Sequence, residues 1–376
     1  MTQPIQALNI LGASAASAQA CGPEGCEAPE TAQDGAAQDS TVHEVVIVGS
    51  GPAGYTAAIY TARAEMKPIV LAGALDAGGA LMTTTDVENF PGFAEGIQGP
   101  ELMTTMQEQA ERFGAQIEFE DVVDVQLEGD VKTITLEDGT VYRAKSVIIA
   151  TGSAYRRLDV TGEDRLSGKG VSWCATCDGF FFKDQDIVVV GGGDSAVEEA
   201  TFLTRFGRTV TLVHRRDALR ASKIMARRAE SDPKLSFAWN SELVSINGGE
   251  KVESITVRDT QTGEEREIAT SAVFEAIGHL PRTDLFQGKL ELDEQGYIVV
   301  EGRSTRTSVE GVFAAGDVVD HTYRQAITAA GSGCQAALDA ERWLADRDAE
   351  AEEAADVADA PTDDTAAFVS EAAARA

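Results

Sequence analysis

Two glycine-rich loops of the same design constrain this chain more than any other feature. The first is Gly49-Ser-Gly-Pro-Ala-Gly54 and the second is Gly191-Gly-Gly-Asp-Ser-Ala196. Each follows a β-branched run and precedes an amphipathic stretch and another β-branched run, with the same spacing in both copies. This order is typical of the βαβ unit, which builds parallel sheets. We therefore predict an α/β fold with two Rossmann-like nucleotide-binding domains, each having helices on both faces of a parallel sheet.

The pattern of apolar residues locates the elements of both units. Strands are expected where aliphatic residues follow one another, and helices where apolar residues recur every three or four positions. The expected strands are 45–48, 68–71, 187–190 and 210–213, and the expected helices are 57–64 and 197–206. Both loops thus lie between the end of a strand and the start of a helix.

The first loop is a candidate site for the pyrophosphate of a dinucleotide. A glycine turn lets the backbone approach the phosphates, and the first N–H groups of the helix point at them. An acidic residue that binds the ribose usually follows about 20 positions later, where this chain has Ala72 and Gly73. The ribose contact therefore has no assigned residue. The candidates are Gly49, Ser50, Gly51, Pro52, Ala53 and Gly54.

The second loop is a candidate site for NADPH. Its candidates are Gly191, Gly193, Asp194, Ser195 and Ala196, and the basic residues after the next strand are His214, Arg215, Arg216 and Arg220. An NAD-dependent protein has a carboxylate at the end of that strand, which would repel a 2′-phosphate. Guanidinium groups bind such a phosphate by charge-assisted hydrogen bonds. The alternative is a solvated basic patch without a ligand.

A close pair of cysteines precedes the second loop. Cys174 and Cys177 are separated by Ala and Thr, and Asp178 follows directly. Thiols at this spacing can form and exchange a disulfide. Half of a zinc site and inert buried cysteines are the alternatives, although the chain has no second pair of cysteines or histidines suited to complete the zinc site. Cys334 is expected in an apolar core.

The residues around the cysteine pair, together with later segments, resemble the low-molecular-weight, bacterial-type thioredoxin reductases of the pyridine nucleotide-disulfide oxidoreductase family. The similarity rests on Cys174–Phe182, the loop at Gly191, the His214–Arg220 segment, Ala276-Ile-Gly-His279, and Gly311–Asp317 with Arg324-Gln-Ala326. It extends from about residue 43 to about residue 345. It implies FAD as a cofactor, thioredoxin as the partner and a homodimer.

The resemblance also implies roles for individual residues. Cys177 would face the flavin, Cys174 would be its partner thiol, and Asp178 would be the acid. Gly278 and His279 would lie near the nicotinamide, although a lone histidine is more often structural. Besides the first glycine loop, the implied FAD contacts are Gly78, Gly79, Asn89, Gly316, Asp317, Arg324, Gln325 and Ala326.

We expect a discontinuous FAD domain with an NADPH domain inserted into it. The expected parts are a disordered tail (1–42), the FAD domain (43–156 and 284–345), the NADPH domain (157–283) and an acidic, disordered or loosely helical tail (346–376). Two cysteines of the first tail, Cys21 and Cys26, are either incidental or a mobile auxiliary thiol pair. The rival functions are a reductase for another thiol protein, a disulfide-forming oxidase, and a nucleotide-sensing protein with structural thiols.

Composition narrows the partners and the compartment. With 62 acidic and 31 basic residues, the formal net charge is −31. This charge repels nucleic acid and anionic membranes, and it reflects either an ordinary acidic surface or adaptation to high salt. The absence of a long apolar run and of basic residues near the N-terminus predicts no membrane span and no targeting peptide. Five cysteines are too few for a secreted disulfide framework, and we expect a cytoplasmic protein.

Overall fold

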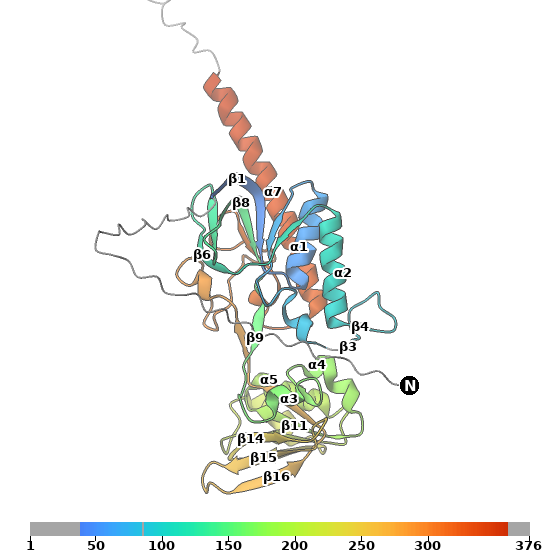
Figure 1. Ribbon diagram of the computed structural model, residues 1–376. Coiled ribbons are helices and arrows are strands. Elements are labelled where there is room, and N and C mark those ends of the chain that lie inside the picture. The colour runs from blue at the N-terminus through green and yellow to red at the C-terminus, as the bar shows by residue number, and fades with distance from the viewer. Residues whose placement is uncertain (1–37, 85, 360–376) are drawn as a thin grey trace, which may run out of the picture. The chain divides into compact units, whose positions relative to one another are not determined.

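The computed structural model describes residues 38–84 and 86–359, and its core contains two main sheets. The first sheet has seven strands in the order β5-β2-β1-β8-β7-β6, with β19 paired to β8 (Figure 1). The order places β1 centrally, with parallel partners on both sides. β6 and β7 add an antiparallel part. The strands are β1 (Gln38–Val48), β2 (Ile69–Leu71), β5 (Gln116–Glu118), β6 (Val122–Gln126), β7 (Lys132–Leu136), β8 (Val141–Ile149) and β19 (Val312–Ala314).

The second sheet is entirely parallel and has the order β10-β17-β11-β12-β13. A separate antiparallel sheet, β14-β15-β16, belongs to the same region. The strands of the parallel sheet are β10 (Val171–Ser172), β11 (Asp186–Gly191), β12 (Thr209–Val213), β13 (Leu235–Ala238) and β17 (Ala272–Ala276). Those of the antiparallel sheet are β14 (Ser241–Asn247), β15 (Ser254–Asp259) and β16 (Glu265–Ala269).

Each main sheet carries helices on one face. In the first domain these are α1 (Pro52–Arg63), α2 (Gly99–Arg112) and α7 (Ala326–Asp359), with a hairpin of β3 (Asp86–Val87) and β4 (Ile97–Gln98) before α2. In the second they are α4 (Ala175–Asp178), α5 (Asp194–Leu203) and α6 (Lys223–Glu230), and the short α3 (Glu163–Leu166) contributes to the core of the other face. The apolar strands fit this arrangement because their successive side chains enter opposite cores.

The expectation of helices on both faces is wrong for the first sheet, and on the second face of the other sheet the one-turn α3 is the only helix among the described residues. On the second face of the first sheet, Phe286 of the 3₁₀ turn η3 (Asp284–Phe286) packs with Leu290 and Ile298. On the second face of the other sheet, the antiparallel strands contribute Leu243 and Ile255 among others. The alternation of polar and apolar residues in these segments forms half-buried strands and loops instead of helices.

The first domain is discontinuous in sequence, as expected. After β8 the chain forms the whole second sheet and then returns with β19, which pairs with β8. The two crossings run through β9 (Ser153–Tyr155) and β18 (His279–Pro281), which pair with each other in antiparallel orientation. The predicted fold class is therefore confirmed, while the domain boundaries near 157 and 283 stay predictions.

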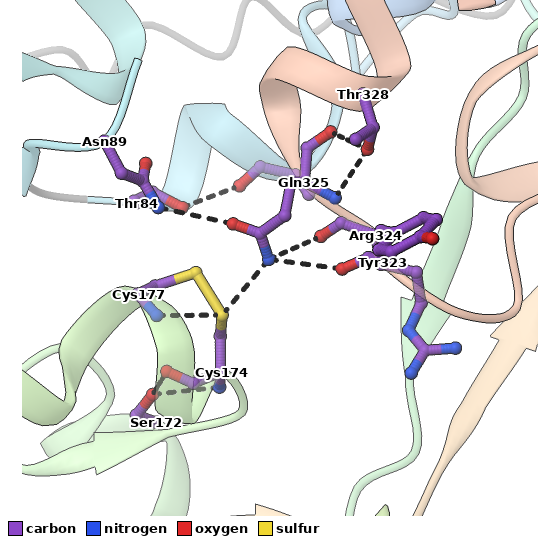
Figure 2. Close-up of a disulfide and its surroundings, with 10 residues drawn as sticks. Thr84, Asn89, Ser172, Cys174, Cys177, Tyr323, Arg324, Gln325 and Thr328 are labelled. Atoms are coloured by element: carbon purple, nitrogen blue, oxygen red, sulfur yellow. Dashed lines mark hydrogen bonds between the residues drawn. A yellow bond between two sulfur atoms is a disulfide. The ribbon is translucent and has the colours of Figure 1, made fainter. Parts of the chain in front are cut away.

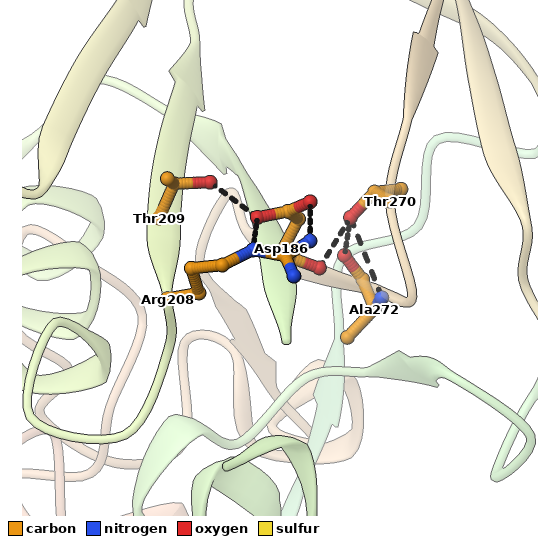
Figure 3. Close-up of polar contacts among 5 residues, drawn as sticks. All are labelled: Asp186, Arg208, Thr209, Thr270 and Ala272. Atoms are coloured by element: carbon orange, nitrogen blue, oxygen red, sulfur yellow. Dashed lines mark hydrogen bonds and ion pairs between the residues drawn. The ribbon is translucent and has the colours of Figure 1, made fainter. Parts of the chain in front are cut away.

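Asp186, at the start of the central strand β11, forms hydrogen bonds with the segments that lead into β12 and β17 on either side (Figure 3). Its carboxylate accepts hydrogen bonds from Arg208 and from the Thr209 hydroxyl, which lies 2.7 Å away. Its backbone carbonyl accepts one from the Thr270 hydroxyl at 2.9 Å. Because this end of the sheet is held, β11 runs in a fixed register toward the second glycine loop at its other end.

Both ends of the described chain differ from the expected boundaries. β1 begins at Gln38, inside the predicted N-terminal tail, and Val42 is already paired with Arg143. α7 passes through 345–346 without a break and ends at Asp359. Alanine and glutamate are strong helix formers, so the helix continues beyond Leu344, the last buried apolar residue in the part of α7 up to Ala355. None of the helices in residues 38–359 is long and apolar enough to cross a membrane.

The burial along α7 predicts where the chain can be shortened. Residues 351–355 are exposed, so ending the chain after Glu350 should change the free energy of unfolding by less than about 1 kcal/mol. Ending it after Leu338 removes Trp343 and Leu344, which are 6% and 4% exposed. This second truncation should cost more than about 4 kcal/mol. Urea unfolding of both variants checks the prediction, and equal stabilities would contradict it.

Candidate active site

The first glycine loop brings the start of α1 close to the end of β1. A Cβ on Gly54 would lie 2.0 Å from the Gly49 carbonyl oxygen, so this approach requires glycine. Gly51 is different, because a Cβ there would meet no heavy atom within 4 Å. Gly51 is the N-cap of α1, and no side chain caps the helix. The first N–H groups of α1 are thus left beside open space, which fits the phosphates of a dinucleotide.

Ser50 joins this loop to two other segments of the first domain. Its hydroxyl donates to the Ala72 carbonyl oxygen at 2.8 Å and accepts from the Gly78 N–H at 2.9 Å. A Cβ on Gly79, the first residue of the 3₁₀ turn η1 (Gly79–Thr83), would lie 3.4 Å from the Gly51 Cα. A Cβ on Gly316 would lie 2.9 Å from the Ala53 Cβ. The predicted residues Gly78, Gly79 and Gly316 therefore meet at the start of α1.

The second glycine loop repeats the open helix start at α5. Gly193 is the N-cap, no side chain caps the helix, and a Cβ on Gly193 would meet no heavy atom within 4 Å. The Asp194 carboxylate accepts a hydrogen bond from the Ser222 N–H at 2.8 Å. The Arg220 N–H donates to the Gly192 carbonyl oxygen at 2.7 Å. These two bonds hold the basic segment that follows β12 against the loop.

Within this basic segment, the histidine and the arginines have different environments. His214 is 5% exposed, its Nδ1 lies 2.8 Å from the Gly191 carbonyl oxygen, and burial lowers its pKa. Arg215, Arg216 and Arg220 are exposed. None of the three belongs to an ion pair found in the described residues. His214 thus contacts the loop, and the three arginines have no ion-pair partner among the described residues.

Cys174, the N-cap residue of α4, and Cys177, inside this one-turn helix, form a disulfide (Figure 2). We call the segment Cys174–Asp178 the cysteine turn. The Cys177 N–H donates to the Cys174 Sγ at 3.2 Å, and the Cys174 N–H donates to the Ser172 hydroxyl at 3.1 Å. Cys177 is exposed and Cys174 is partly buried. The sequence prediction that the two cysteines can form a disulfide agrees with this geometry.

The disulfide lies against predicted residues of the first domain. The Gln325 Nε2 is 3.8 Å from the Cys174 Sγ, and the Asn89 Nδ2 donates to the Gln325 Oε1 at 3.3 Å (Figure 2). Gln325 directly precedes Ala326, where α7 begins. Gly278 lies elsewhere, at the crossing between the domains, where its carbonyl oxygen accepts from the Arg156 N–H at 3.0 Å.

Several titratable groups surround the disulfide and the crossings. Burial raises the pKa of Asp178, while a hydrogen bond from the Ser172 hydroxyl lowers it. Burial and a nearby carboxylate raise the pKa of Asp317 to about 6, against the effect of Arg324. Burial, with Arg324, lowers the pKa of His279 to about 4, so its imidazole is neutral at pH 7. The site can therefore hold protons on carboxyl groups at a pH where exposed carboxyls are ionised.

Four residues at the site were missed from the sequence. Tyr155 on β9 stacks on Trp173 at 5.8 Å between ring centroids and lies 4.9 Å from the His279 ring. Glu199 and Glu275 are carboxyl groups close to the disulfide turn, and each has a buried oxygen without a hydrogen-bond partner. The sequence contained a signal for both glutamates, namely a carboxyl group within an apolar run. Glu275 lies in β17, whose residues are all buried, and Glu199 directly precedes the buried Ala200 of α5.

The other cysteines lie apart from this turn. Cys334 on α7 is a free thiol that is partly buried and hydrogen bonded to the Tyr60 hydroxyl. Cys21 and Cys26, the possible auxiliary pair, lie outside the described residues. Within the described residues, no group of three or more His, Cys, Asp or Glu side chains has the arrangement of a metal site.

Comparison with known sequences identifies the family. Residues 43–333 match the model of the pyridine nucleotide-disulphide oxidoreductases. A thioredoxin reductase from Streptomyces clavuligerus is 67% identical over 306 residues, which are 81% of this chain and 95% of the relative. The match covers both glycine loops and the cysteine pair.

Solved structures agree with the sequence comparison. Thioredoxin reductase from Giardia duodenalis is 44% identical, with a TM-score of 0.78, over 81% of this chain and 100% of that one. Lactococcus lactis thioredoxin reductase in its "FR conformation" is 43% identical, with a TM-score of 0.55, over 81% of this chain and 99% of that one. This chain is therefore an oxidoreductase that belongs to the pyridine nucleotide-disulphide oxidoreductase family, in its thioredoxin reductase branch.

Proposed function

We propose that this chain reduces the disulfide of a thioredoxin with electrons from NADPH, through FAD and the Cys174–Cys177 pair. The observation that carries the proposal is the contact between this disulfide and Gln325. It brings an exchangeable pair of the second domain to residues that we assign to the flavin in the first. Thioredoxin is taken as the substrate from the names of the relatives.

FAD fits the first domain because three separate segments converge on the uncapped start of α1. A bound flavin supplies hydride acceptance from a reduced nicotinamide and electron transfer to a disulfide. The chain's part is to hold the diphosphate at the α1 N–H groups and to exclude water from the reacting atoms. We assign to FAD Gly49–Gly54, Gly78, Gly79, Asn89, Gly316, Asp317, Arg324, Gln325 and Ala326.

NADPH fits the second domain for the same physical reason, with one addition. The α5 start is also uncapped, and the exposed arginines next to it have no carboxylate partner in the described chain. A 2′-phosphate would supply that partner, whereas NADH has none. We assign the pyrophosphate to Gly191, Gly193, Asp194, Ser195 and Ala196, the 2′-phosphate to Arg215, Arg216 and Arg220 with His214 supporting the loop, and the nicotinamide end to Gly278.

The cysteine turn supplies the exchange chemistry and a proton. We assign Cys177 to the flavin side and Cys174 to its partner thiol. When a thiolate attacks the thioredoxin disulfide, a new S–S bond forms and the leaving sulfur needs a proton. Asp178 is adjacent in sequence, and burial raises its pKa. It therefore holds a proton more readily than an exposed aspartate, which suits the role of acid.

The two domains must rearrange during the cycle. A nicotinamide and a disulfide cannot both contact the same reactive region of a flavin, since each needs about 3 to 3.5 Å. Two solved thioredoxin reductases support such movement, because 44% and 43% identity go with TM-scores of 0.78 and 0.55. The crossings at β9 and β18 are the natural hinges, since only two chain segments join the domains.

The oligomeric state and the cellular compartment complete the proposal. A homodimer follows from the resemblance to the family. An exposed, exchangeable cysteine pair in a chain with few cysteines suits a reducing compartment, and we propose the cytoplasm.

The assignment of the cysteines predicts a separation of the two half-reactions. Cys174→Ser or Cys177→Ser should leave FAD bound and reducible by NADPH, because neither change touches a glycine loop. Reduction of thioredoxin should be lost in both variants. Bleaching of the flavin absorbance and insulin-coupled thioredoxin turnover measure the two steps, and Cys334→Ser is the matched control. Normal turnover of either variant would disprove the dithiol assignment.

The assignment of the arginines predicts the cofactor preference. Arg215→Ala combined with Arg216→Ala removes charge-assisted bonds that only NADPH can use. The ratio of kcat/KM for NADPH to that for NADH should fall by about a hundredfold or more. Arg205→Ala, an exposed arginine of the same domain, is the control and should leave the ratio unchanged. An unchanged ratio in the double variant would place the phosphate elsewhere.

The rearrangement predicts that locked domains stop the cycle at one half-reaction. The test uses Gln325→Cys together with Cys177→Ser, and the remaining cysteines other than Cys174 are also replaced by serine. A cleavable bis-maleimide can then join position 325 to Cys174. The locked protein should resist flavin reduction by NADPH, and cleavage of the linker should restore it. Retained absorbance of the oxidised flavin controls for loss of FAD. Rapid reduction of flavin in the verifiably locked protein would reject the mechanism.

A further inference from the structure

Two buried carboxyl groups beside the cysteine turn have no part in the function proposed above. Among the described residues, the buried side-chain atoms without a hydrogen-bond partner are Glu199 Oε2, Glu275 Oε1 and His214 Nε2. His214 belongs to the second glycine loop. A buried oxygen without a partner is costly, and the cost is greatest when the group is charged. The two carboxyls therefore need a physical explanation.

Glu199 holds the residue that follows Cys174. It lies on α5, which packs against α4 (Figure 1). Its carboxyl group accepts a hydrogen bond from the Ala175 N–H, and its Oε2 remains without a partner. Ala175 is the first residue of α4 and is 2% exposed. The carboxyl thus fixes the backbone on the C-terminal side of Cys174.

Glu275 holds the residue that precedes Cys174. It lies on β17 and is 2% exposed. Its Oε2 accepts a hydrogen bond from the Trp173 Nε1 at 3.1 Å, and the group also accepts from the Leu158 N–H. Its Oε1 remains without a partner. The Trp173 indole, and with it the backbone on the N-terminal side of Cys174, is therefore held by a second buried carboxyl.

We propose that Glu199 and Glu275 are positioning residues for the redox pair, each holding one neighbour of Cys174 and each binding a proton on its unpartnered oxygen. The inference rests on the proposed role of the Cys174–Cys177 pair and adds two residues to it. A protonated carboxyl can still accept the N–H bond through its other oxygen. It brings no negative charge to the place where a thiolate forms.

The surrounding charges agree with protonation near neutral pH. Burial raises the pKa of Glu199 to about 7, with Glu198 raising it and Arg324 lowering it. Burial also raises the pKa of Glu275 to about 7, with Glu163 raising it further and Arg157 lowering it. Tyr155 also lies near Glu199, because Glu199 and Asp178 both raise the pKa of its hydroxyl.

This arrangement couples the disulfide to pH in a definite direction. Reduction breaks the S–S bond, takes up two electrons from a dithiol donor, and leaves two sulfurs that bind up to two protons. Below pH 7 both carboxyls are neutral and do not oppose a thiolate. As pH rises through about 7 they ionise, and repulsion between like charges then disfavours the thiolate form. Ionisation of the two carboxyls should therefore make the disulfide harder to reduce than the same cysteine pair would be without these charges nearby.

The test compares variants that keep the hydrogen bond but cannot ionise. Glu199→Gln and Glu275→Gln are equilibrated as full-length holoprotein with reduced and oxidised dithiothreitol at low and high pH. The Cys174–Cys177 peptide is then alkylated and weighed. Near pH 8.5 each variant should favour the dithiol over wild type by about tenfold, and near pH 6 the difference should fall within about twofold. Glu230→Gln, at an exposed glutamate of α6 that contributes to neither pKa shift, should match wild type at both.

Thermal unfolding shows whether each variant is folded. The effect of the glutamine substitutions on stability should depend on pH in the same direction as their effect on the dithiol equilibrium. The pKa of both carboxyls rises from 4.5 to about 7 on folding, so their stabilising contribution is complete below about pH 4.5 and is lost as pH rises through about 7. Both glutamine variants should therefore have a higher Tm than wild type near pH 8.5. Glu199→Ala, which also removes the acceptor, should lose thioredoxin turnover that Glu199→Gln retains, while NADPH-to-flavin transfer stays normal in both.

The outcomes separate this inference from the proposed function. Equal dithiol equilibria in wild type and both glutamine variants at high pH would overturn the inference, even with normal thioredoxin turnover. The dithiothreitol equilibrium needs neither NADPH nor thioredoxin. Failure to reduce thioredoxin with the expected pH response intact would instead reject the proposed substrate and leave the positioning role standing.

Discussion

The two nucleotide sites depend on the close approach of a helix start to the end of a parallel strand. At the first loop a Cβ on Gly54 would overlap the Gly49 carbonyl, and at the second a Cβ on Gly191 would lie 2.5 Å from the Ala196 Cβ. Because each helix starts so close to its strand, its free N–H groups point past the carboxyl edge of the sheet. The remaining parts of each site, such as the Ser50 bonds and the basic segment after β12, are arranged around that edge.

The features predicted from the sequence were those encoded over short distances. The strands and helices of both βαβ units, the glycine loops and the cysteine pair each depend on residues within one segment, and the structure has them where they were expected. Contacts over long distances were not predictable in the same way. Nothing local indicates that Gln325 meets Cys174, 151 positions away. The expectation about what covers the second face of each sheet was wrong for a related reason. The strands and loops that lie there have weaker sequence patterns than the βαβ units.

The cysteine turn is held much more firmly from its own domain than from the other one. Ser172, Glu199 and Glu275 bond to it or to its neighbours from within the second domain. In the described part of the chain, the first domain reaches the Cys174 sulfur only through the Gln325 amide, at 3.8 Å. Movement of one domain against the other would break this weak contact and keep the internal ones. The geometry of the disulfide can therefore be preserved when the turn is carried from the flavin to a protein substrate.

The same internal contacts explain how a strongly acidic chain can keep its redox pair reducible. The formal net charge is −31, and most acidic side chains of the described residues are exposed or partly exposed. Salt screens charges farther apart than about 8 Å under physiological conditions. Such charges affect the approach of other molecules more than the chemistry of one sulfur. Glu199 and Glu275 differ from these exposed groups, because each has a buried oxygen close to the cysteine turn, where water screens a charge less than at the surface. Burial raises the pKa of both groups to about 7, so both lose their charge as the pH falls below about 7, and two carboxyls that could oppose a thiolate are then neutral.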